Sequence, residues 1–136
     1  MITPDSSVVI AALAPWHVAH EEAQEALARS TPRLVAHVAY ETTSALSRMP
    51  EGRRIAPEVV LEALERRFPT DWLALDAADA RAAIHRAVGA GLRGGALYDG
   101  LIAATADRHG AQLLTADRRA RRTYEAFQVQ ASYLAF

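Results

Sequence analysis

Hydrophobic residues are arranged along this chain in two ways, as short continuous runs and as longer stretches with helical spacing. Short runs are typical of strands buried in a parallel sheet, whereas apolar positions three or four apart indicate one face of a helix. Five short strands are predicted, at Met1–Pro4, Arg33–Ala36, Asp71–Leu75, Gln112–Thr115 and Gln128–Gln130. Helices are predicted at Ser6–Leu13, His17–Arg29, Val38–Met49, Glu58–Phe68, Asp76 or Asp79 to Ala90, Ala96–Arg108 and Arg118–Phe127.

Strands and helices therefore alternate along the whole chain, with neither internal repeats nor low-complexity segments. Such alternation is typical of an α/β fold in which helices cover both faces of a parallel sheet. We expect a three-layer sandwich with a central parallel sheet of about five short strands flanked by helices. With 136 residues, the chain is expected to form a single domain, residues 1–136. Its apolar runs are far shorter than a membrane span, so we expect a soluble, cytoplasmic protein.

The most informative stretch is Gly94–Asp117, which reads GGALYDGLIAATADRHGAQLLTAD. It combines a helix that carries Asp99 near its start with a short apolar strand that ends just before Asp117. Asp99 lies on the side of the helix that it shares with Ile102 and Ala106. Either acid alone is explained as a residue that caps or begins a helix. Their function depends on whether other segments bring further acids to the same place.

Two more acids are predicted at the same edge of the sheet. Asp5 directly follows the first strand, and Glu41 lies near the start of the helix after the second strand. Crossover helices run antiparallel to the strands, so their N-terminal turns lie at the edge where the strands end. Taken singly, Asp5 is also explained as a helix cap and Glu41 as an acid favoured by a helix N-terminus. Together with the two acids above, they are expected to form one cluster of four carboxylates.

A cluster of four carboxylates needs compensating charge. Two carboxylates about 5 Å apart repel by roughly 3 kcal/mol at an effective dielectric constant of about 20. This repulsion either keeps some of them protonated or favours a divalent cation. The chain has no cysteine, and carboxylate oxygens suit Mg²⁺ or Mn²⁺ better than zinc. Such a cation activates water and stabilises charge on phosphoryl oxygens, so the spacing leads to the hypothesis of phosphodiester hydrolysis.

Composition adds two constraints. All fifteen basic residues are arginine, which excludes the lysine-dependent sites of P-loop proteins, Schiff-base enzymes and response-regulator receivers. The net charge of −1 does not itself indicate nucleic-acid binding, but neutralising four acids at a metal site would change it to +3. The candidates for contacts with a nucleic-acid backbone are Arg93, Arg118, Arg119, Arg121 and Arg122.

The segments PDSSVVIAAL, AYETTSAL, GGALYDGLIAATA and LLTAD resemble those of PIN-domain ribonucleases, in particular VapC-type toxins of type II toxin–antitoxin pairs. The resemblance covers almost the whole chain and implies a PIN-like fold. Pro4 departs from it, since an apolar residue usually precedes the first aspartate. The resemblance implies that the catalytic residues, which also bind Mg²⁺ or Mn²⁺, are Asp5, Glu41, Asp99 and Asp117. Thr115 is their polar companion, and Ser6, a possible helix cap, is grouped with it as a supporting residue.

The resemblance further implies endonucleolytic cleavage of RNA, a homodimer, and a cognate antitoxin that covers the acidic groove. Two alternatives stay open, a catalytically silent PIN-like interaction domain and a DNA-directed nuclease of the wider PIN and flap-nuclease group. Retention of all four acids argues against a silent domain, because like charges are a burden without a metal. The short chain lacks insertions that would clamp a DNA junction. A phosphatase of the haloacid-dehalogenase type is excluded because Ser7 stands where a second aspartate is needed.

Overall fold

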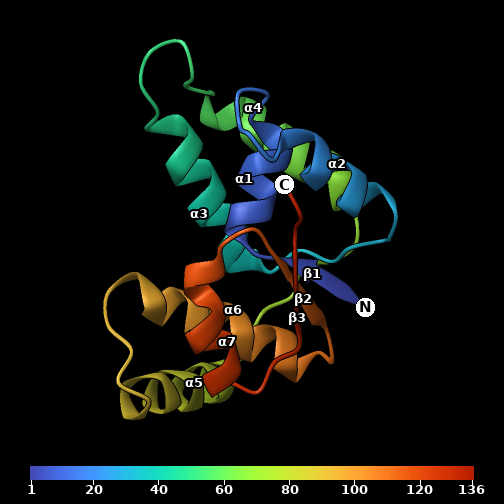
Figure 1. The fold of residues 1–136 in the computed structure, drawn as a ribbon. Helices are drawn as coiled ribbons and strands as arrows, with labels where there is room; N and C mark the ends of the chain where they lie inside the picture. The colour runs from blue at the N-terminus through green and yellow to red at the C-terminus, as the bar shows by residue number, and fades with distance from the viewer.

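Three parallel strands form a sheet between two groups of helices in the computed structural model, which describes residues 1–136 (Figure 1). The strands are β1 (Ile2–Pro4), β2 (Gln112–Thr115) and β3 (Ala131–Tyr133), in the order β1-β2-β3. Pro4 ends β1 and is paired with Leu114 of the central strand. At this last position of the strand, the absence of an N–H on proline is tolerated.

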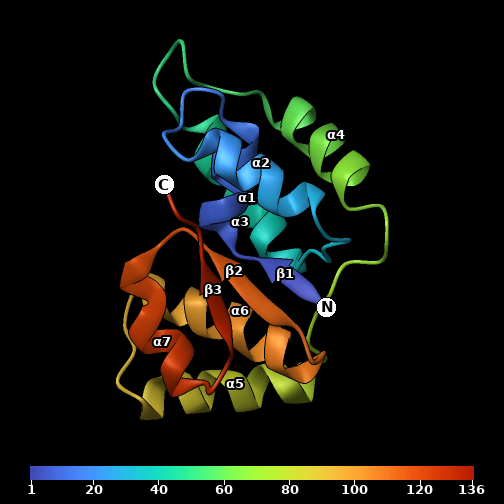
Figure 2. The same ribbon diagram turned by 45° about the vertical axis from the view of Figure 1, so that its right-hand side comes forward.

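Seven α-helices surround this sheet (Figure 2). One side is covered by α1 (Ser6–Leu13), α2 (His20–Ala28), α3 (Ala36–Ser47) and α4 (Pro57–Arg67), and the other by α5 (Ala77–Gly89), α6 (Gly95–Arg108) and α7 (Arg121–Ala126). A short 3-10 helix, η1 (Arg118–Ala120), leads into α7. The predicted α/β fold with a parallel sheet between helices is therefore confirmed. None of the helices combines the length and the hydropathy needed to cross a membrane.

The sheet has three strands, so the prediction of about five was wrong. Two of the predicted strands, Arg33–Ala36 and Asp71–Leu75, meet only in a single parallel bridge between Val35 and Leu73. A backbone hydrogen bond of 2.9 Å joins the first of these segments to β1. Val35 is already the N-cap of α3, so the helix begins before a ladder can form. These segments thus lie beside the sheet without being strands of it.

The last strand begins later than predicted, at Ala131 and not at Gln128. After α7 the chain turns at Gln128, whose φ of 54° is positive. The N–H of Val129 then donates to the carbonyl of Tyr124 at 3.1 Å. Gln128 and Val129 thus end α7, and Ala131–Tyr133 pair with β2. Helix bounds elsewhere differ from the predicted ones by only a few residues, chiefly at α2, which begins at His20.

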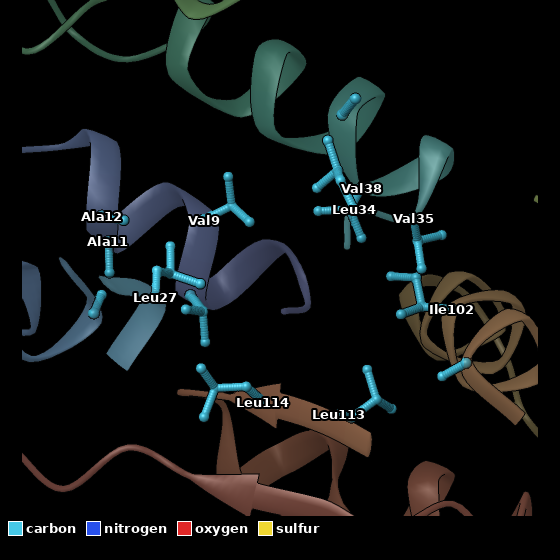
Figure 3. Close-up of a cluster of buried hydrophobic side chains, with 14 of the residues drawn as sticks. Val9, Ala11, Ala12, Leu27, Leu34, Val35, Val38, Ile102, Leu113 and Leu114 are labelled. Atoms are coloured by element: carbon cyan, nitrogen blue, oxygen red, sulfur yellow. The ribbon is translucent and has the colours of Figure 1, made fainter. Parts of the chain in front are cut away.

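The core that positions the acids lies between α1, α3, α6 and the sheet (Figure 3). Val38 and Ile102 are completely buried there, together with Leu113 of the central strand. Burial of one such side chain stabilises the fold by about 1.5–3 kcal/mol. Val38 precedes Glu41 by about one turn on α3, and Ile102 follows Asp99 by about one turn on α6. Packing of the core therefore fixes the two helix segments that carry these acids.

Candidate active site

Asp5 follows β1 directly and is the N-cap of α1. Its side chain is buried, and Oδ1 accepts hydrogen bonds from the backbone N–H of Ser7 at 3.1 Å and of Val8 at 3.4 Å. The hydroxyl of Ser7 also donates to Oδ1, at 2.5 Å, and the hydroxyl of Tyr124 donates to Oδ2 at 2.6 Å. Burial raises the pKa of Asp5 above its usual value, and these hydrogen bonds oppose the rise. Hydrogen bonds to both oxygens thus hold the Asp5 carboxylate in one orientation.

Ser7 connects Asp5 to the end of β2. While it donates to Asp5, its Oγ accepts a hydrogen bond of 2.8 Å from the backbone N–H of Ala116. The same Oγ lies 3.4 Å from Oγ1 of Thr115, which in turn accepts from the N–H of Asp117 at 3.0 Å. The half-buried Ser7 hydroxyl therefore connects the loop after β1 to the loop after β2, and Thr115 belongs to this network.

Asp117 is the N-cap of the 3-10 helix η1 and is paired with an arginine. Its Oδ1 accepts from the backbone N–H of Arg119 at 2.9 Å and from Nε of the same residue at 3.1 Å. The Arg119 side chain is almost fully exposed, so solvent weakens this ion pair. The hydrogen bond from the backbone N–H of Arg119 is therefore the main interaction that orients the Asp117 side chain.

Glu41 and Asp99 reach the same region from α3 and α6, each beyond the first turn of its helix. Burial raises the pKa of Glu41, and the charge of Asp5 adds to the rise. Burial is also the main reason why the pKa of Asp99 is raised from 3.8 to about 6. The charges of Asp5, Glu41 and Asp117 add to the rise for Asp99, in that order, whereas Arg119 lowers it. The other three acids are thus close enough to Asp99 to influence its ionisation.

Glu41 keeps an unsatisfied acceptor at the site. Its Oε1 is buried and has no hydrogen-bond partner. On the preceding turn of α3, Nε2 of His37 lies 3.8 Å from Oε2 of Glu41. Ser6 begins α1, and its hydroxyl opposes the rise in the pKa of Glu41. An oxygen that is both buried and unpaired is unfavourable in a protein unless a ligand or a proton satisfies it.

The four carboxylates are chemically suited to a hard divalent cation, but their side chains are not arranged as a coordination shell. No group of three or more Asp, Glu or His side chains in the structure has the geometry to hold a metal ion. All four groups nevertheless offer oxygen atoms, and three of them have a raised pKa. Because bare carboxylates repel one another, their side chains would have to rotate toward a cation in order to ligate it.

The five candidate arginines differ in how they are engaged. Arg118 lies over an aromatic ring, Arg119 pairs with an acid of the site, and Arg121 pairs with a glutamate one turn later. Arg93 and Arg122 are exposed and take part in no ion pair. Only the last two present a guanidinium that is free of competing partners.

Ser7 and Tyr124 contribute to the site although the sequence did not single them out for it. Ser7 could have been found, because the side chain of a capping aspartate accepts hydrogen bonds from backbone groups two or three residues later. Tyr124 lies 119 positions from Asp5 along the chain. No spacing or motif connects the two, so their contact depends entirely on the tertiary fold.

Comparison with known proteins agrees with this architecture. The PIN domain family model matches residues 2–126. Over 130 residues the chain is 45% identical to Ribonuclease VapC40 of Mycobacterium tuberculosis, with 96% of both chains covered. It is 35% identical over 125 residues to Ribonuclease VapC27 of the same organism, covering 92% of this chain and 90% of the relative.

Two solved structures share the fold. The crystal structure of FitAcB from Neisseria gonorrhoeae has a TM-score of 0.70 at 24% identity, with 96% of both chains covered. VapBC2 from Rickettsia felis, bound to a DNA fragment from its promoter, has a TM-score of 0.68 at 18% identity, covering 99% of this chain and all of that one. At such identities the structures support the fold alone. Together with the family match and the two closer relatives in sequence, they lead to one conclusion: the chain belongs to the PIN-domain family and, within it, to the VapC proteins.

Proposed function

We propose that this chain is a metal-dependent endoribonuclease and the toxin component of a toxin–antitoxin pair. The main support is the raised pKa of Asp99, to which the charges of Asp5, Glu41 and Asp117 all contribute. RNA is the proposed substrate because both M. tuberculosis relatives are named ribonucleases. Mg²⁺ or Mn²⁺ is the proposed cofactor, since all four groups supply hard oxygen donors.

Each acid is assigned a role that follows from its surroundings. Asp5 and Asp99 are the proposed primary ligands, because Asp5 is held by hydrogen bonds and Asp99 is repelled by the other three acids. A bound cation would supply an activated water and would offset charge on the phosphate. Glu41, with its unpaired Oε1, is assigned to orienting or deprotonating the attacking water. Asp117 binds metal directly or through water, and the neighbouring Arg119 is available to a phosphate oxygen.

The proposed partners are a cognate antitoxin, which covers the acidic groove, and a second copy of the chain. Support for the antitoxin comes from the membership of the chain among the VapC proteins and from the solved VapBC2 assembly of R. felis. A simple genomic check is whether a short reading frame with a DNA-binding N-terminus lies immediately upstream. Co-purification of its product with this chain, and the molar mass of each in solution, would test both partners.

The test of the activity is RNA cleavage by wild type, Asp99→Asn and Asp107→Asn, in Mn²⁺ and in EDTA. Asp107 is a matched control because it lies on the same helix and is exposed. Wild type and the control should cleave RNA in Mn²⁺ only. Asp99→Asn should lose about 100-fold or more, the scale expected when one catalytic group is removed.

The outcomes separate the remaining alternatives. Cleavage that survives in Asp99→Asn or in EDTA would contradict the metal mechanism. Cleavage of DNA but not RNA would assign the chain to the DNA-directed nucleases. Cleavage of neither, by a folded protein supplied with Mn²⁺, would support the silent interaction domain.

A further inference from the structure

Two aromatic rings stack beside the acids. His37 of α3 and Tyr98 of α6 have ring centroids 5.0 Å apart and planes that differ by 10°. Each ring belongs to the first turn of a helix that carries one of the acids. His37 lies one turn before Glu41, and Tyr98 directly precedes Asp99. The stack therefore joins the two helix ends at the border of the acid cluster.

The Tyr98 ring is not part of the hydrophobic core. Its side chain is 52% exposed, and it lines the apolar groove of about 490 Å³ between α5 and α6. Singly exposed apolar residues are common and need no explanation by themselves. What distinguishes Tyr98 is that its exposed ring stacks on a second ring, that of His37, whose Nε2 lies 3.8 Å from a carboxylate oxygen of Glu41.

His37 holds this ring in place. The Nε2 atom of His37 is buried, makes no hydrogen bond, and lies 3.8 Å from Oε2 of Glu41. The imidazole is thus confined by Tyr98 on its face and by the acid at its edge. A ring that is backed in this way loses little further freedom when a second aromatic surface stacks on it.

We propose that Tyr98, backed by His37, is a stacking platform for one unpaired RNA base next to the phosphodiester that is cleaved. This inference rests on the proposed ribonuclease function and adds to it a contact between Tyr98 and an unstacked base of a single-stranded segment or loop. Bases in such RNA stack on tyrosine and histidine rings and are recognised there, whereas bases in a duplex are inaccessible. Arg93, exposed and free of ion pairs in the loop before α6, is available for the adjoining backbone.

Fluorescence of 2-aminopurine tests the stack directly, because this base analogue is quenched when it stacks. Short single-stranded RNAs with the analogue at successive positions would be bound to the Asp99→Asn protein in EDTA, where the proposed cleavage is disabled. We expect quenching at one position of the single strand and none in a duplex of the same sequence. Adding Tyr98→Leu should abolish the quenching and weaken RNA binding roughly tenfold, whereas Tyr98→Phe and Tyr98→Trp should retain both.

Tyr40 provides a matched control. It also directly precedes a site acid, Glu41, and is 79% exposed, but it lines a different groove, between α3 and α4. Tyr40→Leu should leave quenching and affinity unchanged. His37 is a positioning residue in this proposal, so His37→Leu should weaken the quenching and His37→Phe should restore it through ring contact alone.

Three results would overturn the proposal. They are quenching that persists in Tyr98→Leu, absence of quenching at every position in the parent protein, and a Tyr98→Leu variant that changes only its molar mass in solution. The last would identify Tyr98 as a contact between protein chains. Failure of the proposed function is a separate observation, namely a wild-type protein that quenches the analogue normally but cleaves no RNA in Mn²⁺.

Discussion

The acid cluster has two sides that are built differently. On one side Asp5 is buried and accepts hydrogen bonds from the backbone and from the hydroxyls of Ser7 and Tyr124. On the other side, Glu41 and Asp99 are half-buried and poorly satisfied. Glu41 has an oxygen without any partner, and no hydrogen bond opposes the raised pKa of Asp99.

This difference indicates a division of roles between the two sides. Hydrogen bonds from the protein orient Asp5 before any ligand arrives, which makes it a fixed point of the site. Glu41 and Asp99 instead retain repulsion that only a proton or a cation relieves. The first side should therefore contribute to stability, and the second should lower stability in the absence of a ligand.

The largest effect on stability is expected from Tyr124→Phe, which removes one donor from the fixed side. Oδ2 of Asp5 would lose its buried hydrogen bond, so the free energy of unfolding should fall by about 2 kcal/mol. Urea denaturation measures this change. Tyr40→Phe, which alters an exposed tyrosine, should stay within about 0.5 kcal/mol of wild type. Equal stability of wild type and Tyr124→Phe would show that this hydrogen bond does not hold Asp5.

A gain in stability is expected when an acid is removed from the side formed by Glu41 and Asp99. Asp99→Asn removes the repulsion from three acids and should raise the free energy of unfolding by about 1 kcal/mol at pH 7 in EDTA. This figure is less than the full shift in pKa implies, because solvent screens a half-exposed group. The control is Asp107→Asn on the same helix, measured by the same denaturation. Loss of stability in Asp99→Asn would refute the assignment of repulsion to this side.

A smaller effect is the dependence of this gain on pH. Folded protein holds the Asp99 proton up to about pH 6, whereas the unfolded chain releases it near the ordinary pKa of 3.8. As the pH falls from 7 toward 4, the folded state is protonated first, and the repulsion disappears. The difference in unfolding free energy between Asp99→Asn and wild type should therefore shrink toward zero. A difference that stays constant over this range would mean that charge on Asp99 is not its cause.

The sequence predicted those parts of the molecule that local patterns determine. Asp5 and Asp117 follow strands at positions where a cap is needed, and the structure has both as caps. Gly110, with a φ of 65°, follows the C-cap His109 of α6, at the position where glycine commonly ends a helix. Such features can be predicted from the sequence because they depend only on residues that are close along the chain.

Features that depend on distant contacts could not be predicted. The segment Arg33–Ala36 has the apolar run expected of a strand. How many of its residues pair with another segment depends on where α3 begins and on which segment lies beside Arg33–Ala36. The hydrogen bond from Tyr124 to Asp5 requires α7 to lie close to the end of β1. The stack of His37 on Tyr98 likewise requires two separate helices to meet. In each case the chain offers suitable residues, and only the fold pairs them.

The most direct test of the difference between the two sides is the melting temperature of wild type and Asp99→Asn, in EDTA and after addition of Mn²⁺. In EDTA the variant should melt at the higher temperature, because it lacks the repulsion. Saturating Mn²⁺ should raise the wild-type midpoint by about 5 °C or more and the variant by much less, so that their order reverses. No shift in wild type, or an equal shift in both proteins, would contradict a metal site built on these acids.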